Sequence, residues 1–160
     1  MNRIIFIIYL LFTFNTYAIE VFCKFEEVYI DGTTQQGFFL IKNELLRYQY
    51  NNKALYTIFK NEDGFYLVEN QDKSKFRRVN NNTEILQELI QLGKIYPNVQ
   101  KNYYLQDKKI TLEKSKKINF LKRLVIKSDN LNLSVYFNDC KLQTIHKSYF
   151  RHRPVIEYHQ

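Results

Sequence analysis

The chain has 160 residues, of which 45% are hydrophobic and 16% aromatic, and its formal net charge at pH 7 is +8. This length fits one domain, and the hydrophobic fraction is too high for a disordered chain and too interrupted for a protein with many membrane spans. With only 4 Gly and 2 Pro, the composition excludes glycine-rich phosphate loops and proline-rich linkers. The positive charge allows an anionic partner, such as a lipid headgroup or a nucleic acid, without choosing between them.

The first eighteen residues have the layout of a secretory signal peptide. Arg3 gives a positive start, residues 4–14 are an apolar run, and Thr16 and Ala18 place small residues before a cleavage point. An apolar run of about eleven residues is too short to span a hydrocarbon core of ~30 Å comfortably, although an uncleaved anchor is the alternative. We therefore expect residues 1–18 to be removed and residues 19–160 to form one exported domain.

Cys23 and Cys140 are the two cysteines of the chain. In an oxidising compartment they can form a disulfide, which would close almost the whole domain and stabilise it by about 4 to 5 kcal/mol through the entropy of the unfolded chain. Two buried thiols packed as small apolar groups are an equally good interpretation. The sequence leaves both open, because a bridge depends on the distance between the two Cα atoms.

Short apolar and aromatic runs, separated by turn residues, fill the chain as far as residue 79. The clearest alternation is in residues 45–50, where Leu46, Tyr48 and Tyr50 share one face of a strand. The other runs are rich in β-branched and aromatic residues and end at Asp-Gly or Asn-rich turns. The strands predicted in this half are residues 21–30, 36–42, 45–50, 54–60, 65–69 and 75–79.

Residues 83–92 change to a helical period. Their apolar side chains recur at helical spacing, Asn82 or Thr83 is the predicted N-cap, and Gly93 stands just after the predicted end. Short turns at residues 129–130 and 138–139 would make the last three strands a meander. The strands predicted after the helix are residues 103–106, 110–113, 121–128, 131–137 and 141–149. This pattern predicts a mainly β fold: a single antiparallel sheet, curled or closed, with one short amphipathic helix covering part of it.

The sequence contains no catalytic or metal-binding motif. His146 lies in a predicted strand, and His152 and His159 lie in a basic tail at no spacing that a zinc site uses. Cys140 and His146 could act as nucleophile and base, but no motif surrounds them. We therefore expect a protein that is not an enzyme and has no metal or other cofactor, and a hydrolase is the least favoured alternative.

Basic residues gather in four runs, at residues 73–78, 108–109, 114–117 and 122–123. Interleaved Tyr and Phe could stack nucleobases in an exposed groove. However, export argues against a nucleic-acid partner, and a solvated strand face with basic turns accounts for the same residues. We expect no nucleic acid, and weak attraction to an anionic membrane surface stays open.

Residues 36–70 carry a characteristic order of strands. A Gly opens an apolar strand that ends in Lys, followed by a Leu-Arg-aromatic-x-aromatic strand, a Thr-Ile-apolar strand and an aromatic strand, with polar turns between them. This order resembles the periplasmic outer-membrane lipoprotein carrier family, the LolA-like proteins. Phe25-Glu26 looks like that family's Phe-Gln, residues 83–92 look like its mid-chain helix, and residues 121–150 look like its late strands. The resemblance covers most of residues 25–154.

The resemblance implies an incomplete β-barrel with a helical lid over an apolar cavity. Such a cavity takes the acyl chains of a lipoprotein, or another lipid, across the periplasm toward the outer membrane, with an inner-membrane donor and an outer-membrane acceptor protein as further partners. We expect a periplasmic monomer. The residues that would line the cavity are Phe39, Ile41, Leu46, Tyr48, Tyr50, Ile58, Leu133, Val135 and Phe137. Those that would face it from the lid are Ile85, Leu86 and Leu89.

The alternative is a non-transport interaction domain of the envelope, with the same fold and a cavity filled by its own side chains. The same apolar residues would then be ordinary core. Two family features are also altered in this chain. The family commonly has Lys-Arg-Pro after its second strand, with the Arg latching the lid, whereas Asn43 stands at that Arg position here. The mature chain also begins almost directly with a strand, which leaves little room for the family's first helix. We therefore expect a loosely closed lid.

Overall fold

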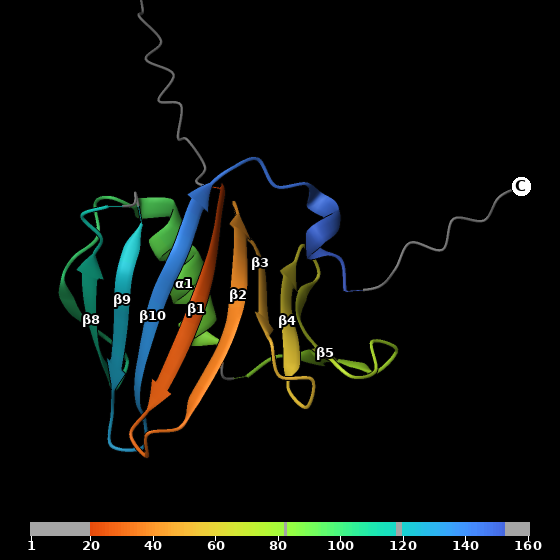
Figure 1. The fold of residues 1–160 in the computed structure, drawn as a ribbon, viewed down its shortest axis with the longest axis horizontal. Coiled ribbons are helices and arrows are strands. Elements are labelled where there is room, and N and C mark those ends of the chain that lie inside the picture. The colour runs from red at the N-terminus through yellow and green to blue at the C-terminus, as the bar shows by residue number, and fades with distance from the viewer. Residues whose placement is uncertain (1–19, 82, 118–119, 153–160) are drawn as a thin grey trace, which may run out of the picture.

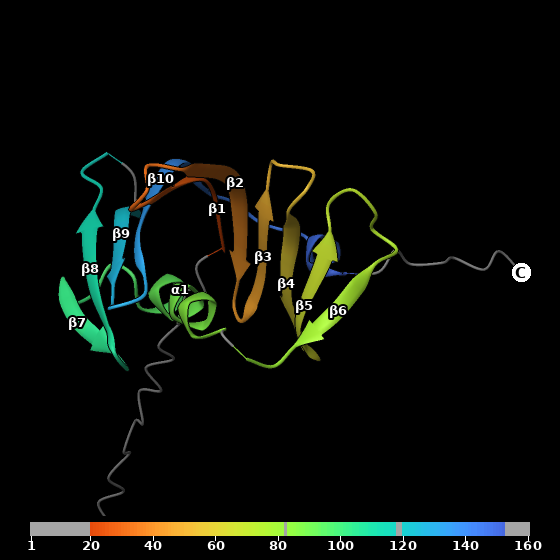
Figure 2. The same ribbon diagram turned by 90° about the horizontal axis from the view of Figure 1, so that it is seen from below.

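The computed structural model describes residues 20–81, 83–117 and 120–152. The predicted signal peptide, Asn82 and His159 lie outside these residues. In the described part of the chain, ten strands form one antiparallel sheet in the order β6-β5-β4-β3-β2-β1-β10-β9-β8-β7 (Figure 1 and Figure 2). The strands are β1 (Glu20–Tyr29), β2 (Thr34–Lys42), β3 (Leu45–Tyr50), β4 (Tyr56–Asn61), β5 (Gly64–Glu69), β6 (Phe76–Val79), β7 (Asn102–Leu105), β8 (Lys108–Lys114), β9 (Leu121–Lys127) and β10 (Asn132–Leu142).

The sheet is open and curls around the α-helix α1 (Glu84–Ile95), which lies inside its concave face (Figure 2). Strand β1 sits at the centre of the sheet, because it pairs with β2 on one side and with β10 on the other. The prediction of a mainly β, single curled antiparallel sheet with one short amphipathic helix is confirmed. No helix in the described part of the chain is long and apolar enough to cross a bilayer.

The concave face carries the main core. Alternation along β1 buries Val21, Cys23, Phe25 and Glu27 on one face of the strand, and the first three join the core cluster with buried residues of the neighbouring strands and of α1. Because Gly37 on β2 has no side chain, the ring of its partner Phe25 can pack directly on its backbone. A Cβ on Gly37 would lie 2.0 Å from the carbonyl oxygen of Gln49 and 2.6 Å from Phe25 Cζ. Burial of this apolar surface is the main force that holds the sheet in its curl.

Helix α1 begins after Thr83, one of the two predicted N-caps, but continues one turn beyond the predicted end. Gly93 is therefore a buried residue inside the helix, and the prediction that it follows the helix is wrong. The helix continues because Leu89, Ile90, Leu92 and Gly93 all pack on the sheet. It ends at Tyr96, whose backbone N–H donates to the carbonyl oxygen of Leu92, directly before Pro97.

Strand β10 is a single long strand, and the predictions of a turn at residues 138–139 and of a separate strand at 141–149 are wrong. Phe22 pairs with Lys141 and Lys24 pairs with Asn138, so the predicted turn is a β-bulge in which Asp139 has a φ of 49°. Strand β10 stays paired on both sides of the bulge, because β1 is long enough to pair with it from Leu133 to Leu142. The chain then forms the 3₁₀ helix η1 (Lys147–Phe150).

Cys23 and Cys140 form a disulfide at this bulge, with their Cα atoms 4.1 Å apart. The bridge joins β1 to β10 and links two cysteines that are 117 positions apart in the sequence. A second, smaller core packs under η1 on the convex face, where Phe150 and Ile145 contact Leu40. The disulfide thus attaches β1, at the start of the described chain, to β10, and the core under η1 packs the end of the described chain on β2.

Candidate functional site

The concave face beneath α1 is filled by side chains of the protein. Seven of the nine predicted cavity residues are buried in the main core, namely Phe39, Ile41, Leu46, Tyr48, Leu133, Val135 and Phe137. Phe120, which precedes β9, fills the space between the two halves of the sheet. Its ring centroid lies 5.9 Å from that of Phe39 and 5.8 Å from that of Phe137. With α1 in place, these seven residues are core.

The predicted lid residues do face the sheet. Leu89 is buried, and Ile85 and Leu86 are partly buried against the main core. Among the described residues, one side-chain contact joins the helix to each wall of the curled sheet. On one wall the Lys94 ammonium lies 2.7 Å from a Glu44 carboxylate oxygen in the turn between β2 and β3, and on the other the Tyr103 hydroxyl of β7 donates to the Glu88 carboxylate.

The ion pair of Lys94 with Glu44 lies next to Asn43, which the resemblance to LolA-like proteins would align with their lid-latching Arg. Asn43 itself is exposed in the turn with a φ of 55°. The Lys94 ammonium lowers the pKa of the Glu44 carboxyl, but both side chains are open to solvent, and such pairs contribute little to stability. The contact between α1 and the turn that joins β2 to β3 is therefore weak.

Part of the concave face is not covered by the helix. Figure 2 shows that β4, β5 and β6 extend beyond α1. Ile58 pairs with Tyr48 on one side and with Leu67 on the other, so the apolar stripe of the core continues onto this uncovered wall. A cavity of about 460 Å³ lies here. Its lining residues are Tyr29, Tyr50, Leu55, Tyr56, Ile58 and Leu67, with Asp31 and Thr33 of the turn between β1 and β2 and Gln35 near the start of β2.

Tyr50 and Ile58 are the two predicted cavity residues that line this open cavity, and both are only partly buried. The cavity has the size of a small-molecule site and is lined mainly by aromatic and aliphatic side chains. The structure therefore divides the predicted cavity into a filled part beneath the helix and an open part beside it.

A buried carboxylate supports the wall of the open cavity. Glu27 is 5% exposed and accepts hydrogen bonds from the hydroxyls of Tyr29 at 2.7 Å, Tyr48 at 2.8 Å and Tyr50 at 3.1 Å. Burial raises the pKa of all three tyrosines, and the nearby Glu27 charge raises it further. The hydroxyls of Tyr29 and Tyr50 are thereby held at Glu27 while their side chains line the cavity.

Sequence reasoning missed Glu27, although its signal was present. Residues 21, 23, 25 and 27 alternate with solvent-facing residues, and this period places Glu27 on the buried face of the strand. A carboxylate on such a face needs hydrogen-bond donors. The alternating tyrosines at positions 48 and 50 are two of them.

The candidate enzyme residues do not assemble. Cys140 is bonded to Cys23 and is therefore no free thiol nucleophile, while the His146 ring caps η1 by accepting from the backbone N–H of Ser148. His152 stacks on Tyr66 with ring centroids 3.8 Å apart. Among the described residues, no group of three or more His, Cys, Asp or Glu could hold a metal ion.

Comparison with known proteins identifies a solved structure with a similar fold. No family model and no curated protein matches the sequence. Among solved structures, a LolA superfamily protein from Nitrosomonas europaea superposes with a TM-score of 0.51 at 10% sequence identity, over 84% of this chain and 90% of that chain. At this identity the likeness shows the fold alone. The chain has a LolA-like fold, an open antiparallel sheet curled around a helix.

Proposed function

We propose that the protein is a carrier that binds an acyl chain, of a lipoprotein or of another lipid, on the uncovered part of its concave sheet. The observation that supports this most is the open cavity of about 460 Å³ beside α1, whose wall continues the apolar stripe of the core. The LolA-like fold is compatible with this role, and a fold alone does not define one.

The partial cover suits a carrier that releases its cargo. Each buried CH₂ contributes about 0.8 kcal/mol, so a fully buried chain of ~14 methylenes would be held by about 11 kcal/mol. Cargo bound that tightly would not be handed on. A cavity that buries only part of the chain lowers this free energy to a range in which transfer is possible.

In this proposal the helix is the movable part. The predicted floor residues beneath α1, such as Phe39, Leu46 and Tyr48, could reach a ligand only if the helix moved. Its polar attachments are the exposed Lys94–Glu44 pair and the hydrogen bond between Glu88 and Tyr103. An acyl chain that entered beside Ile58 would then extend under the helix in place of its apolar side chains.

Export belongs to the same proposal. The signal-peptide pattern in residues 1–18, and a disulfide of the kind that persists in oxidising compartments, both support a periplasmic location. Transfer toward the outer membrane would require an inner-membrane donor and an outer-membrane acceptor. A monomer is the simplest form of such a carrier.

A second candidate function is an envelope interaction domain whose cavity is self-filled. The observation in its favour is the dense aromatic packing under α1, where Phe39, Phe120 and Phe137 contact one another. In that case, the helix would be a fixed part of the core. The two functions differ in whether the native protein takes up an apolar ligand.

The test is binding of the fluorescent apolar probe bis-ANS to the native protein, followed by displacement with a lipidated peptide. Ile58→Glu places a charge in the cavity wall and should weaken probe binding about tenfold or more. Leu142→Glu is the matched control, since Leu142 is 53% exposed and lies outside the cavity lining. Tyr56→Glu, at a cavity residue that is 38% exposed, tests the same wall without disturbing the core. Equal binding by all three variants would contradict the proposed site.

A further inference from the structure

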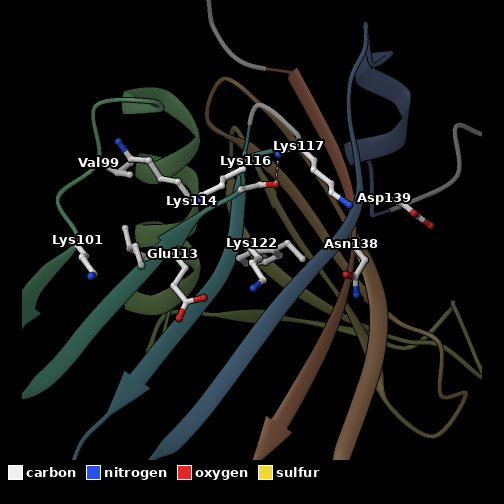
Figure 3. A pocket seen from close by; sticks show the side chains of 12 residues that line it. Val99, Lys101, Glu113, Lys114, Lys116, Lys117, Lys122, Asn138 and Asp139 are labelled. Carbon is white, nitrogen blue, oxygen red and sulfur yellow. Dashed lines mark hydrogen bonds between the residues drawn. The ribbon is translucent and has the colours of Figure 1, made fainter.

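A second and larger cavity lies where strands β9 and β10 separate. The ladder between them ends at the pair of Arg123 with Tyr136, while β10 continues along β1 as far as Leu142. Beyond that pair lies a cavity of about 890 Å³, whose lining includes Ser115, Lys116 and Lys117 after β8 and Asn138 and Asp139 of β10 (Figure 3).

Two β-bulges border this cavity. In the ladder between β8 and β9, Glu113 pairs with Arg123 and Lys114 pairs with Leu121, so Lys122 is the extra residue of a bulge. In the ladder between β1 and β10 the register shifts next to Asp139. Bulges redirect side chains and are frequent beside functional sites. Here both bulges contribute a residue to the lining, Lys122 and Asp139.

The wall of the cavity is strongly cationic. Five lysines from four segments of the chain line it, namely Lys101, Lys114, Lys116, Lys117 and Lys122. The two carboxylates in the lining are already engaged elsewhere. Asp139 lies 2.7 Å from the ammonium of Lys24, and Glu113 lies 3.6 Å from the guanidinium of Arg123. Among the described residues, none of the five lysines forms an ion pair.

The lysines are set around an apolar floor. Val99, Leu112 and Phe137 line the base of the cavity and are all buried in the main core. Lys114 is fixed in place, since its ammonium donates to the carbonyl oxygen of Pro97 at 2.6 Å. Like charges gathered in a concave site repel one another and attract a compact anion, with which they can form charge-assisted hydrogen bonds.

We propose that this lysine cavity binds a phosphate group. The phosphate would lie among the lysine ammonium groups, either as the headgroup of an anionic lipid whose apolar part follows the floor toward Phe137, or as free phosphate. The site shares no lining residue with the cavity beside α1, so it does not depend on the acyl-chain proposal.

The experiment is isothermal titration of the full mature chain with two probes. One is dihexanoyl phosphatidylglycerol below its micelle-forming concentration, and the other is inorganic phosphate. The test variant is the triple substitution Lys101→Gln, Lys117→Gln and Lys122→Gln. The control is Lys53→Gln, Lys109→Gln and Lys127→Gln, which removes the same charge from exposed lysines outside the cavity. Thermal unfolding of both variants checks that they fold.

We expect saturable binding that the test variant weakens about tenfold or more, while the control stays within about twofold of the unsubstituted protein. Binding of the lipid but not of inorganic phosphate would assign the site to a lipid headgroup, whereas equal affinity for both would assign it to the phosphate alone. Equal losses in the two variants would show only a general attraction to positive charge and would overturn the proposal. An absence of saturable binding to either probe would also overturn it.

Discussion

Gly93 of α1 lies directly against Ile41 of β2, and a Cβ on Gly93 would stand 3.4 Å from Ile41 Cγ2 and 3.5 Å from Ile41 Cδ1. The helix therefore rests on the sheet at a distance that only the smallest side chains allow. This contact sets how closely α1 covers the filled part of the concave face.

Substitutions at Gly93 should separate helix stability from lid closure. Gly93→Ala adds a Cβ that just fits and removes the cost of Gly in a helix, so it should stabilise the protein by up to about 1 kcal/mol in urea unfolding. Gly93→Leu overpacks the contact and should destabilise by about 1 to 3 kcal/mol. If α1 is a movable lid, the Leu variant should also bind more bis-ANS than the unsubstituted protein. Unchanged probe binding in a folded but destabilised Leu variant would indicate a fixed helix.

The burial of Tyr48 beside Glu27 predicts a loss of stability at alkaline pH. Burial raises the pKa of Tyr48 well above its ordinary value of about 10. Above that pH the unfolded chain releases the tyrosine proton while the folded chain retains it, so the free energy of unfolding falls as the pH rises. Below it, both states hold the proton and the contribution is fully present.

Urea midpoints measured from pH 8 to pH 11 should therefore decline in the upper part of that range. Tyr48→Phe should make the decline shallower and should lower stability at neutral pH by about 1 to 3 kcal/mol, because Glu27 loses a donor. The slope should not vanish, since burial also raises the pKa of Tyr29 and Tyr50. A variant with the same alkaline slope as the unsubstituted protein would contradict this account of the cluster.

The disulfide should contribute a large part of the free energy of unfolding. Thiol titration of unfolded, non-reduced protein should find no free thiol from Cys23 or Cys140. Replacing both by Ala should lower the free energy of unfolding by about 4 to 5 kcal/mol, since the bridge closes a long loop of the unfolded chain. Reduction of the unsubstituted protein should have a similar effect. Two free thiols per chain in the non-reduced sample would contradict the bridge.

Export predicts a new N-terminus. Sequencing of the protein from its host should begin at Ile19, and the protein should appear in an osmotic-shock fraction. Protein that still begins at Met1 and sediments with membranes would show that residues 1–18 are an anchor.

Much of the fold could be predicted because its signals are local. Except at the C-terminal end, each predicted strand agrees with the structure to within about two residues, since alternation and turn residues lie within each segment. Residues 138–139 have the composition of a turn, but the length of β1 makes them a bulge. That outcome depends on a strand more than a hundred residues away, which local patterns do not report.

The binding surfaces were less predictable for the same reason. Alternation shows that Tyr48 and Tyr50 share a face, but only the position of α1 decides that Tyr48 is buried while Tyr50 borders a cavity. The lysine cavity combines Lys101 with a basic run that begins at residue 114, and two bulges complete it. In the sequence, these lysines looked like separate solvated groups.

The central claim is that the native protein carries an acyl chain, and native mass spectrometry tests it most directly. The protein would be purified from its own envelope without detergent, with the Ile58→Glu and Leu142→Glu variants prepared in the same way. We predict a bound lipid or acylated peptide on the unsubstituted protein and on Leu142→Glu, and little or none on Ile58→Glu. A folded, unsubstituted protein that carries no lipid and takes up none when one is supplied would contradict the account and favour the self-filled interaction domain.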